Sequence, residues 1–218
     1  MPKETYFNLP DEKRERFLEA AINEFADNDY PNASISKVCK QAGIAKGSFY
    51  QYFEDKKDLL MYMIELSLVE KQVLIDSIEI PDSESGFFDS LRWVFKVQTG
   101  YSIEHPRLTE VIYRAFYGAL PFKDEMIENL KQAGYDGYRQ LLLKGIEDGS
   151  IRPDIDLDAA TFMISTLFAE LGRYIERQLK LDNKAMFTRE LSDAQWEEAS
   201  KVFDGLLRLL ESGLKASD

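Results

Sequence analysis

The chain has 218 residues, of which 44% are hydrophobic, and it carries a net charge of −12 at pH 7 with one cysteine and one histidine. With Cys39 and His105 alone, the sequence excludes an internal disulfide and a di-iron site with two Glu-x-x-His motifs, and it argues against a structural zinc site. The strongly negative charge argues against a general nucleic-acid binder.

The first segment has the features of an amphipathic helix. Residues 9–12, Leu-Pro-Asp-Glu, favour a helix start because proline and acidic residues suit the first turn. Residues 28–32, Asn-Asp-Tyr-Pro-Asn, end the helix. Between them, apolar residues recur at helical spacing and form one face: Phe17, Leu18, Ala21, Ile22 and Phe25.

Short helices and then a long one are expected up to residue 78. Ser34 is a suitable N-cap, and the D-x-x-D pair formed by Asp55 and Asp58 suits the start of a long helix. The expected elements are, in order, a helix from Ser34 to about Gln41, a tight turn over 42–44, a short helix near 46–52, and a long helix from about Asp55 that could reach Ile78.

Residues 81–86, Pro-Asp-Ser-Glu-Ser-Gly, are the clearest break in the chain. No strand pattern of useful length is present, so the predicted fold class is all-α. No apolar run approaches the roughly 20 residues of a membrane span, and no secretory signal is expected, so we expect a cytoplasmic protein. Further helices are expected near residues 86–103, 106–118, 122–148, 156–180 and 192–214.

Residues 34–50 have the features of a helix-turn-helix. The small side chain of Cys39 suits a close helix crossing, Gly43 tolerates the positive φ of a tight turn, and Val38, Ile44 and Phe49 are spaced to form a shared core. In this geometry the N-terminal part of the second helix enters the DNA major groove.

Charge is distributed unevenly along the chain. Residues 34–57 carry five lysines against two acidic residues, a local charge of +3, whereas residues 61–218 carry 18 basic and 28 acidic residues, a local charge of −10. A small basic patch on an acidic body is a pattern that requires explanation.

From about Asp11 to Leu60 the sequence resembles the N-terminal domain of TetR-type transcriptional regulators. Residues 43–60, GIAKGSFYQYFEDKKDLL, are close to that family's signature. The resemblance implies a three-helix DNA-binding domain over residues 1–58, with the helix-turn-helix at about 34–53. A long helix would join it to a helical ligand-binding and dimerisation domain over residues 59–218.

The resemblance also implies which residues meet DNA. Side chains at positions 46, 48 and 51 would meet bases, and those at 34, 50 and 56 would contact phosphates. The implied DNA-binding residues are Ser34, Lys46, Gly47, Ser48, Tyr50, Gln51, Tyr52 and Lys56.

Two features depart from the family's pattern. Ala45 stands where many members have a Ser or Thr that caps the recognition helix, and alanine cannot cap. Many members also carry a basic N-terminal arm. Here Lys3 is the only basic residue before Asp11, so no arm contacts with DNA are expected.

The second domain is rich in aromatic residues, most of which should pack in its core. By resemblance to the family, some are expected to line an apolar ligand pocket between helices. Four glycines interrupt the helical patterns, either to make room for a cavity or to allow close helix crossing: Gly118, Gly134, Gly137 and Gly172. The candidate ligand-binding residues are Trp93, Tyr101, Tyr113, Phe116, Tyr117, Tyr138, Phe162 and Tyr174.

The helices at about 156–180 and 192–214 are strongly apolar, and the first is apolar on most sides. A helix of this kind must be buried on both faces. In the family two such helices from each subunit pair as a four-helix dimer interface. The alternative is that both helices only close the core of one subunit.

We therefore predict a homodimeric, DNA-binding transcriptional regulator, most simply a repressor that a small molecule releases from a palindromic operator. The ligand would act by tilting the long helix that joins the domains. No catalytic residue, cofactor, metal site or membrane contact is predicted. The alternative is a helical-bundle enzyme or small-molecule carrier without specific DNA binding, although no nucleophile–base spacing, phosphate loop or metal cluster supports it.

Overall fold

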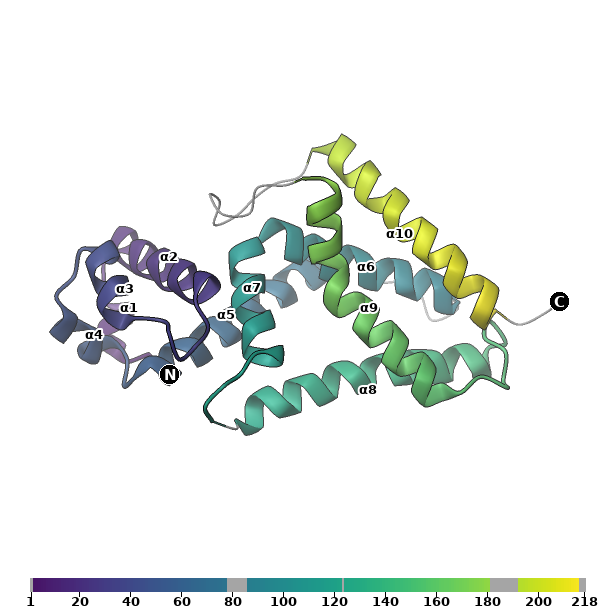
Figure 1. Cartoon of the computed structure of the whole chain (residues 1–218), viewed down its shortest axis with the longest axis horizontal. Coiled ribbons are helices and arrows are strands. Elements are labelled where there is room, and N and C mark those ends of the chain that lie inside the picture. Colours follow the sequence, from purple (N-terminus) through teal and green to yellow (C-terminus); the bar gives the residue numbers. More distant parts are fainter. Residues whose placement is uncertain (1, 78–85, 123, 181–191, 216–218) are drawn as a thin grey trace. The chain divides into compact units, whose positions relative to one another are not determined.

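Helices dominate the computed structural model, which describes residues 2–77, 86–122, 124–180 and 192–215. Within these ranges the chain forms ten α-helices and no strand (Figure 1), as predicted for an all-α fold. The chain divides into two compact units, the first comprising residues 1–73 and 106–123 and the second residues 74–105 and 124–218. Each unit therefore combines two separate stretches of the chain.

The first unit is built on α2 (Asp11–Asp27), which buries the apolar face expected from its spacing. Next come α3 (Ile35–Ala42), α4 (Lys46–Tyr52) and the first part of α5 (Lys56–Ser77). Aromatic rings fill the space between them: Phe53 stacks on Phe17 at 5.6 Å and on Phe49 at 5.7 Å between ring centroids. All three side chains are fully buried, so this small unit has a compact aromatic core.

Helix α7 (Pro106–Tyr117) belongs to the first unit, although residues 74–105 separate it in the chain from the rest of that unit. Its Arg107 is 93% buried, and the guanidinium donates to the side-chain and backbone oxygens of Asn23 at 2.9 and 3.0 Å. The same guanidinium pairs with Asp27 at 2.8 Å, and Arg114 pairs with Asp29. The C-terminal end of α2 is thus held to α7 by charged groups as well as by packing.

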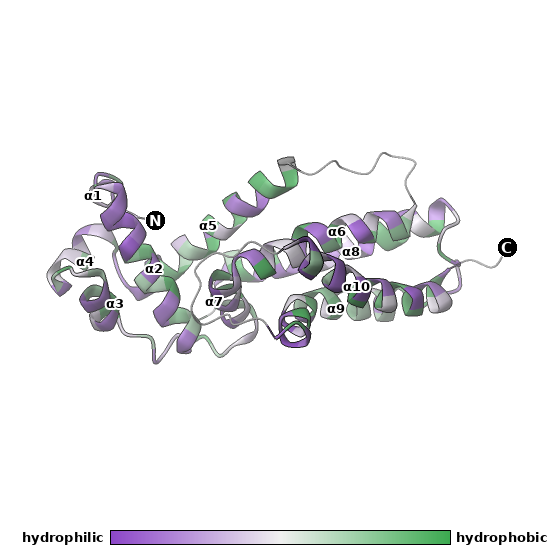
Figure 2. Ribbon diagram, turned by 90° about the horizontal axis from the view of Figure 1, so that it is seen from above, coloured by the Kyte–Doolittle hydropathy of each residue, from purple (hydrophilic) through white to green (hydrophobic). Residues whose placement is uncertain are grey.

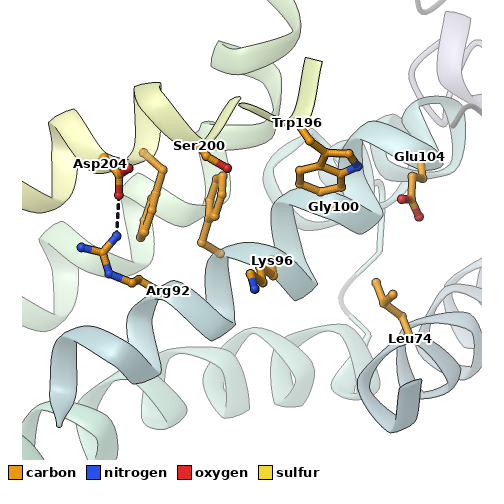
Figure 3. A pocket seen from close by; sticks show the side chains of 10 residues that line it. Leu74, Arg92, Lys96, Gly100, Glu104, Trp196, Ser200 and Asp204 are labelled. Carbon is orange, nitrogen blue, oxygen red and sulfur yellow. Dashed lines mark hydrogen bonds and ion pairs between the residues drawn. The ribbon is translucent and has the colours of Figure 1, made fainter. Parts of the chain in front are cut away.

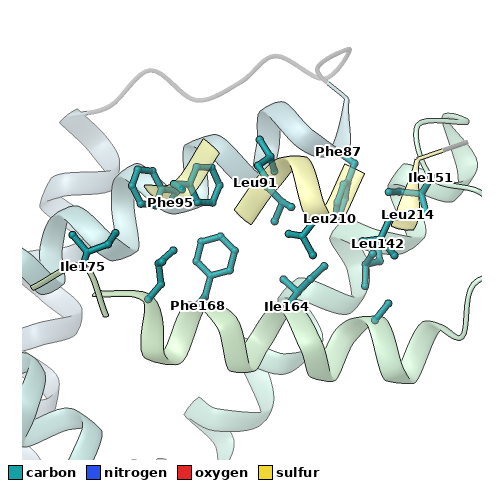
Figure 4. Close-up of a cluster of buried hydrophobic side chains, with 14 of the residues drawn as sticks. Phe87, Leu91, Phe95, Leu142, Ile151, Ile164, Phe168, Ile175, Leu210 and Leu214 are labelled. Atoms are coloured by element: carbon teal, nitrogen blue, oxygen red, sulfur yellow. The ribbon is translucent and has the colours of Figure 1, made fainter. Parts of the chain in front are cut away.

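The second unit consists of α6 (Phe87–Glu104), α8 (Glu125–Glu147), α9 (Leu157–Gln178) and α10 (Asp193–Leu214) around one hydrophobic core. Bands of hydrophobic residues recur along these helices (Figure 2). Phe95 of α6 stacks on Phe203 of α10 at 4.1 Å between centroids. The core also contains Phe87, Leu91, Leu142, Ile151, Ile164, Phe168, Ile175, Leu210 and Leu214 (Figure 4).

The four glycines that interrupt helical patterns have different roles. A Cβ on Gly172 would lie 2.7 Å from Cβ of Ser102, so this glycine allows α9 to cross α6 closely. A Cβ on Gly118 would lie 2.4 Å from the carbonyl oxygen of Arg114, at the end of α7. Gly134 and Gly137 on α8 have no such neighbour within 4 Å, so they leave open space instead.

The predicted helices agree with the structure to within a few residues, apart from the short helix α1 (Glu4–Phe7), which was not predicted. The predicted end of the long helix at Ile78 and most of the predicted break at 81–86 lie outside the described residues. None of the helices in the described ranges is long and apolar enough to cross a membrane.

Candidate nucleic-acid interface and ligand cavities

Helices α3 and α4 form the predicted helix-turn-helix. Ser34 is the N-cap of α3, where its hydroxyl accepts from the backbone N–H of Lys37 at 3.4 Å. Gly43 ends α3 in the left-handed conformation, with φ of 69°, which explains why a glycine is needed there. Val38 and Cys39 of α3 and Phe49 of α4 are buried where the two helices pack, as their spacing predicted, whereas Ile44 is half-buried.

One face of α4 carries polar and aromatic side chains into solvent. Lys46, Gly47, Tyr50 and Gln51 are exposed, and the Tyr50 side chain is 52% exposed although Phe49 beside it is fully buried. Of the other predicted contact residues on α4, Ser48 and Tyr52 are half-buried. The exposed face provides donors, acceptors and one aromatic ring, which are the groups that contact phosphates and base edges.

The start of α3 is held by a buried carboxylate. Glu24 of α2 is 95% buried, and its Oε1 accepts from the backbone N–H of Ser34 at 2.9 Å. Lys37 pairs with the same oxygen at 3.7 Å. Because the Ser34 hydroxyl accepts from Lys37, its own proton is directed elsewhere and can donate to a phosphate.

Lys56 opens α5, and its ammonium is turned toward the loop between α2 and α3. The Nζ donates to the carbonyls of Tyr30, Pro31 and Ala33 at 2.6, 3.2 and 3.0 Å and lies 4.6 Å from the Tyr30 ring centroid. Partial burial lowers the pKa of Lys56. Three carbonyls match the three N–H donors of an ammonium, so Lys56 braces this loop, and its predicted phosphate contact stays a prediction.

The N-terminal segment meets the C-terminal end of α4. The backbone N–H of Lys3 donates to the carbonyl of Tyr52 at 2.8 Å, its Nζ donates to the carbonyl of Tyr50 at 2.8 Å, and the Thr5 hydroxyl donates to the carbonyl of Gln51. Sequence reasoning missed these contacts because four residues show no helical periodicity and their partners lie 46 or more positions away.

A cavity of about 460 Å³ lies between α6 and α8. Trp93 and Gln98 line it from α6, and Gly134, Gly137 and Tyr138 line it from α8. Gln98 donates to the Tyr138 hydroxyl at 3.1 Å, and the Trp93 indole N–H is buried without an acceptor among the described residues. The two glycines create the space, and the polar groups provide a place for one polar end of an apolar ligand.

A second cavity of about 460 Å³ lies between α6 and α10, with Leu74 of α5 at one edge (Figure 3). Its floor is aromatic, and the Trp196 ring lies so close to Gly100 that a Cβ there would be 2.9 Å from the indole. Arg92 pairs with Asp204 across the cavity wall. The two cavities use different residues of α6, which therefore separates them.

Two of the eight predicted ligand-binding residues, Trp93 and Tyr138, line the cavity between α6 and α8. Tyr101 is buried against the ring of His105, at 4.6 Å between centroids. The remaining five line neither cavity: Tyr113, Phe116 and Tyr117 lie on α7 in the first unit, and Phe162 and Tyr174 are exposed on α9.

Several large apolar side chains of α9 and α10 face solvent in the single chain. Phe162, Met163 and Tyr174 of α9 are exposed by 65%, 42% and 40%, and Leu209 of α10 is exposed by 70%. These are the two helices that the resemblance to the family assigns to a dimer interface, and exposed apolar surface is typical of such interfaces.

Comparison with known proteins agrees with this arrangement. A family model described as "Bacterial regulatory proteins, tetR family" matches residues 17–63, and one described as "Tetracyclin repressor-like, C-terminal domain" matches residues 85–215. The crystal structure of a TetR family transcriptional regulator from Chloroflexus aurantiacus is 35% identical, with a TM-score of 0.86 over the full length of both chains.

More distant relatives share the same fold. The fatty acid metabolism regulator protein of Bacillus subtilis is 26% identical over 78% of this chain and 88% of its own. The transcriptional regulator FadR of Bacillus subtilis, solved in complex with stearoyl-CoA, is 21% identical with a TM-score of 0.64, covering 91% of this chain and 98% of that one. With a family model over more than half of its length and a relative 35% identical from end to end, the chain belongs to the TetR family and is a DNA-binding transcriptional regulator.

Proposed function

We propose that the protein is a homodimeric repressor that reads a palindromic operator through α4 and is released by a small molecule bound in the second unit. The observation that carries the proposal is the exposed polar face of α4, which is supported by a buried aromatic core and lies within residues 17–63, the stretch that matches the family model of bacterial regulatory proteins. Neither this match nor the fold favours the enzyme or carrier alternative. A repressor of this kind would act on DNA in the cytoplasm.

In this proposal the residues of α4 divide into two groups. Lys46, Ser48 and Gln51 read base edges, since their side chains provide hydrogen-bond donors and acceptors. Tyr50 contacts phosphate, together with Ser34, and Gly47 lets the backbone approach DNA closely. Two subunits read half-sites separated by one or more helical turns, roughly 34 Å for each turn.

Fluorescence anisotropy on operator DNA at several salt concentrations tests the assignment of α4. Lys46→Ala and Tyr50→Ala are expected to weaken operator binding by roughly 5- to 150-fold while the circular dichroism spectrum stays that of the wild type. Lys13→Ala is a matched control, because Lys13 is an exposed lysine on α2 of the same unit. If both α4 variants bind like Lys13→Ala, α4 is not the recognition helix.

We propose that the dimer forms through α9 and α10. The support is the exposed apolar surface of these helices, in particular Leu209 at 70% exposure. Leu209→Glu is expected to shift the protein from dimer to monomer in analytical ultracentrifugation, whereas Leu143→Glu on α8, 36% exposed, is expected to leave the dimer intact. Equal behaviour of the two variants would place the interface elsewhere.

We propose that the effector binds between α6 and α8 and has a long apolar body with one polar end. The lining supports this class: Trp93 and Leu141 offer apolar surface, while Gln98, Tyr138 and Lys144 offer polar groups. The stearoyl-CoA in the Bacillus subtilis relative is a molecule of this class and is the first compound to test. A ligand that binds the non-binding conformation more tightly shifts the population away from DNA.

The two tryptophans distinguish the two cavities, because the chain has only Trp93 and Trp196 and each lines a different one. Titration with stearoyl-CoA is expected to change the tryptophan fluorescence of Trp196→Phe but not that of Trp93→Phe, and to displace operator DNA. The reverse pattern would assign the ligand to the cavity between α6 and α10. Gly137→Leu, which fills the first cavity, is expected to abolish the response while operator binding remains.

A further inference from the structure

The recognition helix of this protein is too short to be stable by itself. Helix α4 has seven residues, and its N-cap residue Ala45 provides no side-chain cap. Isolated helices shorter than about 12 residues are marginal in water, and the last four carbonyls of any helix have no partner within it. Partners outside α4 for these carbonyls would therefore stabilise its C-terminal end.

The N-terminal segment satisfies those carbonyls almost entirely. Of the last four residues of α4, Phe49 accepts from the backbone N–H of Phe53 at 2.9 Å. The other three carbonyls, of Tyr50, Gln51 and Tyr52, accept from the Lys3 ammonium, the Thr5 hydroxyl and the Lys3 backbone N–H. The positive charge of Lys3 also lies where the partial negative charge at a helix C-terminus favours a cation.

The capping residues are themselves anchored. Tyr6, in the helix α1 that follows Lys3, is fully buried. Its ring centroid lies 5.0 Å from that of Phe53, 5.5 Å from that of Tyr62 and 5.9 Å from that of Phe17. The segment is thus inserted into the same aromatic core that supports α4, so it is a fixed part of the first unit.

We propose that residues 3–6 form an external C-cap that positions the recognition helix, so that operator affinity depends on residues that do not touch DNA. This rests on the proposed role of α4 in reading the operator. Thr5 and Tyr6 are positioning residues, and Lys3 provides its charge to α4 instead of serving as an arm in the minor groove. A change at the N-terminus would then act on DNA binding through α4.

Thr5 offers a test with a closely matched control. Thr5→Val keeps the shape of the side chain but removes the donor to Gln51, whereas Thr5→Ser keeps the hydroxyl. In the DNA-free protein, Thr5→Val is expected to speed hydrogen exchange at the amides of residues 48–53. Thr5→Ser is expected to exchange these amides as slowly as the wild type does. Operator affinity of Thr5→Val is expected to fall roughly 2- to 10-fold, as for the loss of one hydrogen bond, with an unchanged salt slope.

Other outcomes would overturn the proposal in distinguishable ways. If Lys3→Gln lowers the salt slope by about one while Thr5→Val binds normally, Lys3 contacts phosphate directly and the segment is an arm. If Lys46→Ala weakens binding but Thr5→Val changes neither exchange nor affinity, the recognition helix stands and the external cap is wrong. If Thr5→Val speeds exchange while it and Lys46→Ala both bind operator normally, the proposed role of α4 fails.

Discussion

Replacing Arg107 by methionine tests whether α7 is a structural part of the first unit. The guanidinium makes two hydrogen bonds to Asn23, at 2.9 and 3.0 Å, from a site that is 93% buried. Hydrogen bonds of a charged group contribute about 1.5–3 kcal/mol each, and the methionine side chain recovers part of the packing. Arg107→Met is therefore expected to lower the free energy of unfolding by about 2–4 kcal/mol.

The pair with Asp27 provides an internal comparison. Asp27 is 60% exposed, so water replaces its partner readily, and Asp27→Asn is expected to cost less than about 1 kcal/mol. Urea denaturation followed by far-ultraviolet circular dichroism, with hydrogen exchange at the amides of α2 and α7, measures both variants. If Arg107→Met destabilises these helices no more than Asp27→Asn does, the buried contact to Asn23 does not hold α7 in place.

Three further predictions concern packing and the buried polar contacts. Gly134→Ala is expected to stabilise the protein by about 0.5–1 kcal/mol in thermal denaturation, because the new Cβ meets no neighbour. Gly172→Ala is expected to destabilise it by about 1–3 kcal/mol, because its Cβ would meet Ser102, and the opposite order of the two variants would contradict the assigned roles. Cys39 is buried, and burial raises the pKa of its thiol. A chromogenic thiol reagent at pH 8 is therefore expected to react far more slowly with the native protein than with the urea-unfolded protein, and equal rates would show an accessible thiol. Lys56→Met leaves three loop carbonyls without their donor, so its unfolding free energy is expected to fall by about 1–3 kcal/mol, and an unchanged melting temperature would refute the bracing role.

Local signals were sufficient to predict most of the helices. Ser34 caps α3, Gly43 ends it with a positive φ, and Asp55 accepts from the backbone N–H of Asp58 at 2.8 Å at the start of α5. Each of these features depends on residues within a few positions of one another, so a single sequence contains the information. The helix-turn-helix could be predicted for the same reason.

Features that depend on distant residues could not be predicted in the same way. Helix α1 has four residues, and its Thr5 contacts the carbonyl of Gln51, which lies 46 positions away in α4. The sequence predicted one domain boundary near residue 58. The structure groups residues 106–123 with residues 1–73, and the contact of Arg107 with Asn23 joins these two separate stretches. A linear pattern does not indicate which separate stretches will join.

The candidate ligand cavity shows the same limit for side chains. Aromatic residues at helical spacing look alike in sequence, yet Trp93 lines a cavity, Tyr101 is packed in the core and Phe162 faces solvent. The difference is decided by which helix lies opposite, and in particular by Gly134 and Gly137, which leave space facing Trp93. The resemblance to the family implied a ligand-binding domain, whereas the packing of α6 against α8 located the cavity.

The stretches of the two units alternate along the chain, and this arrangement decides which unit is completed first during synthesis. The first unit has all of its parts once residue 123 has been made. Helix α6 is by then already present, but the partners of Phe87, Leu91 and Phe95 on α9 and α10 are still to come. At that length the chain contains every residue of the first unit, together with a helix α6 whose core partners have not been made, and partly formed cores of this kind are prone to aggregation. The first unit is therefore complete in sequence before helices α8, α9 and α10 of the second unit have been made.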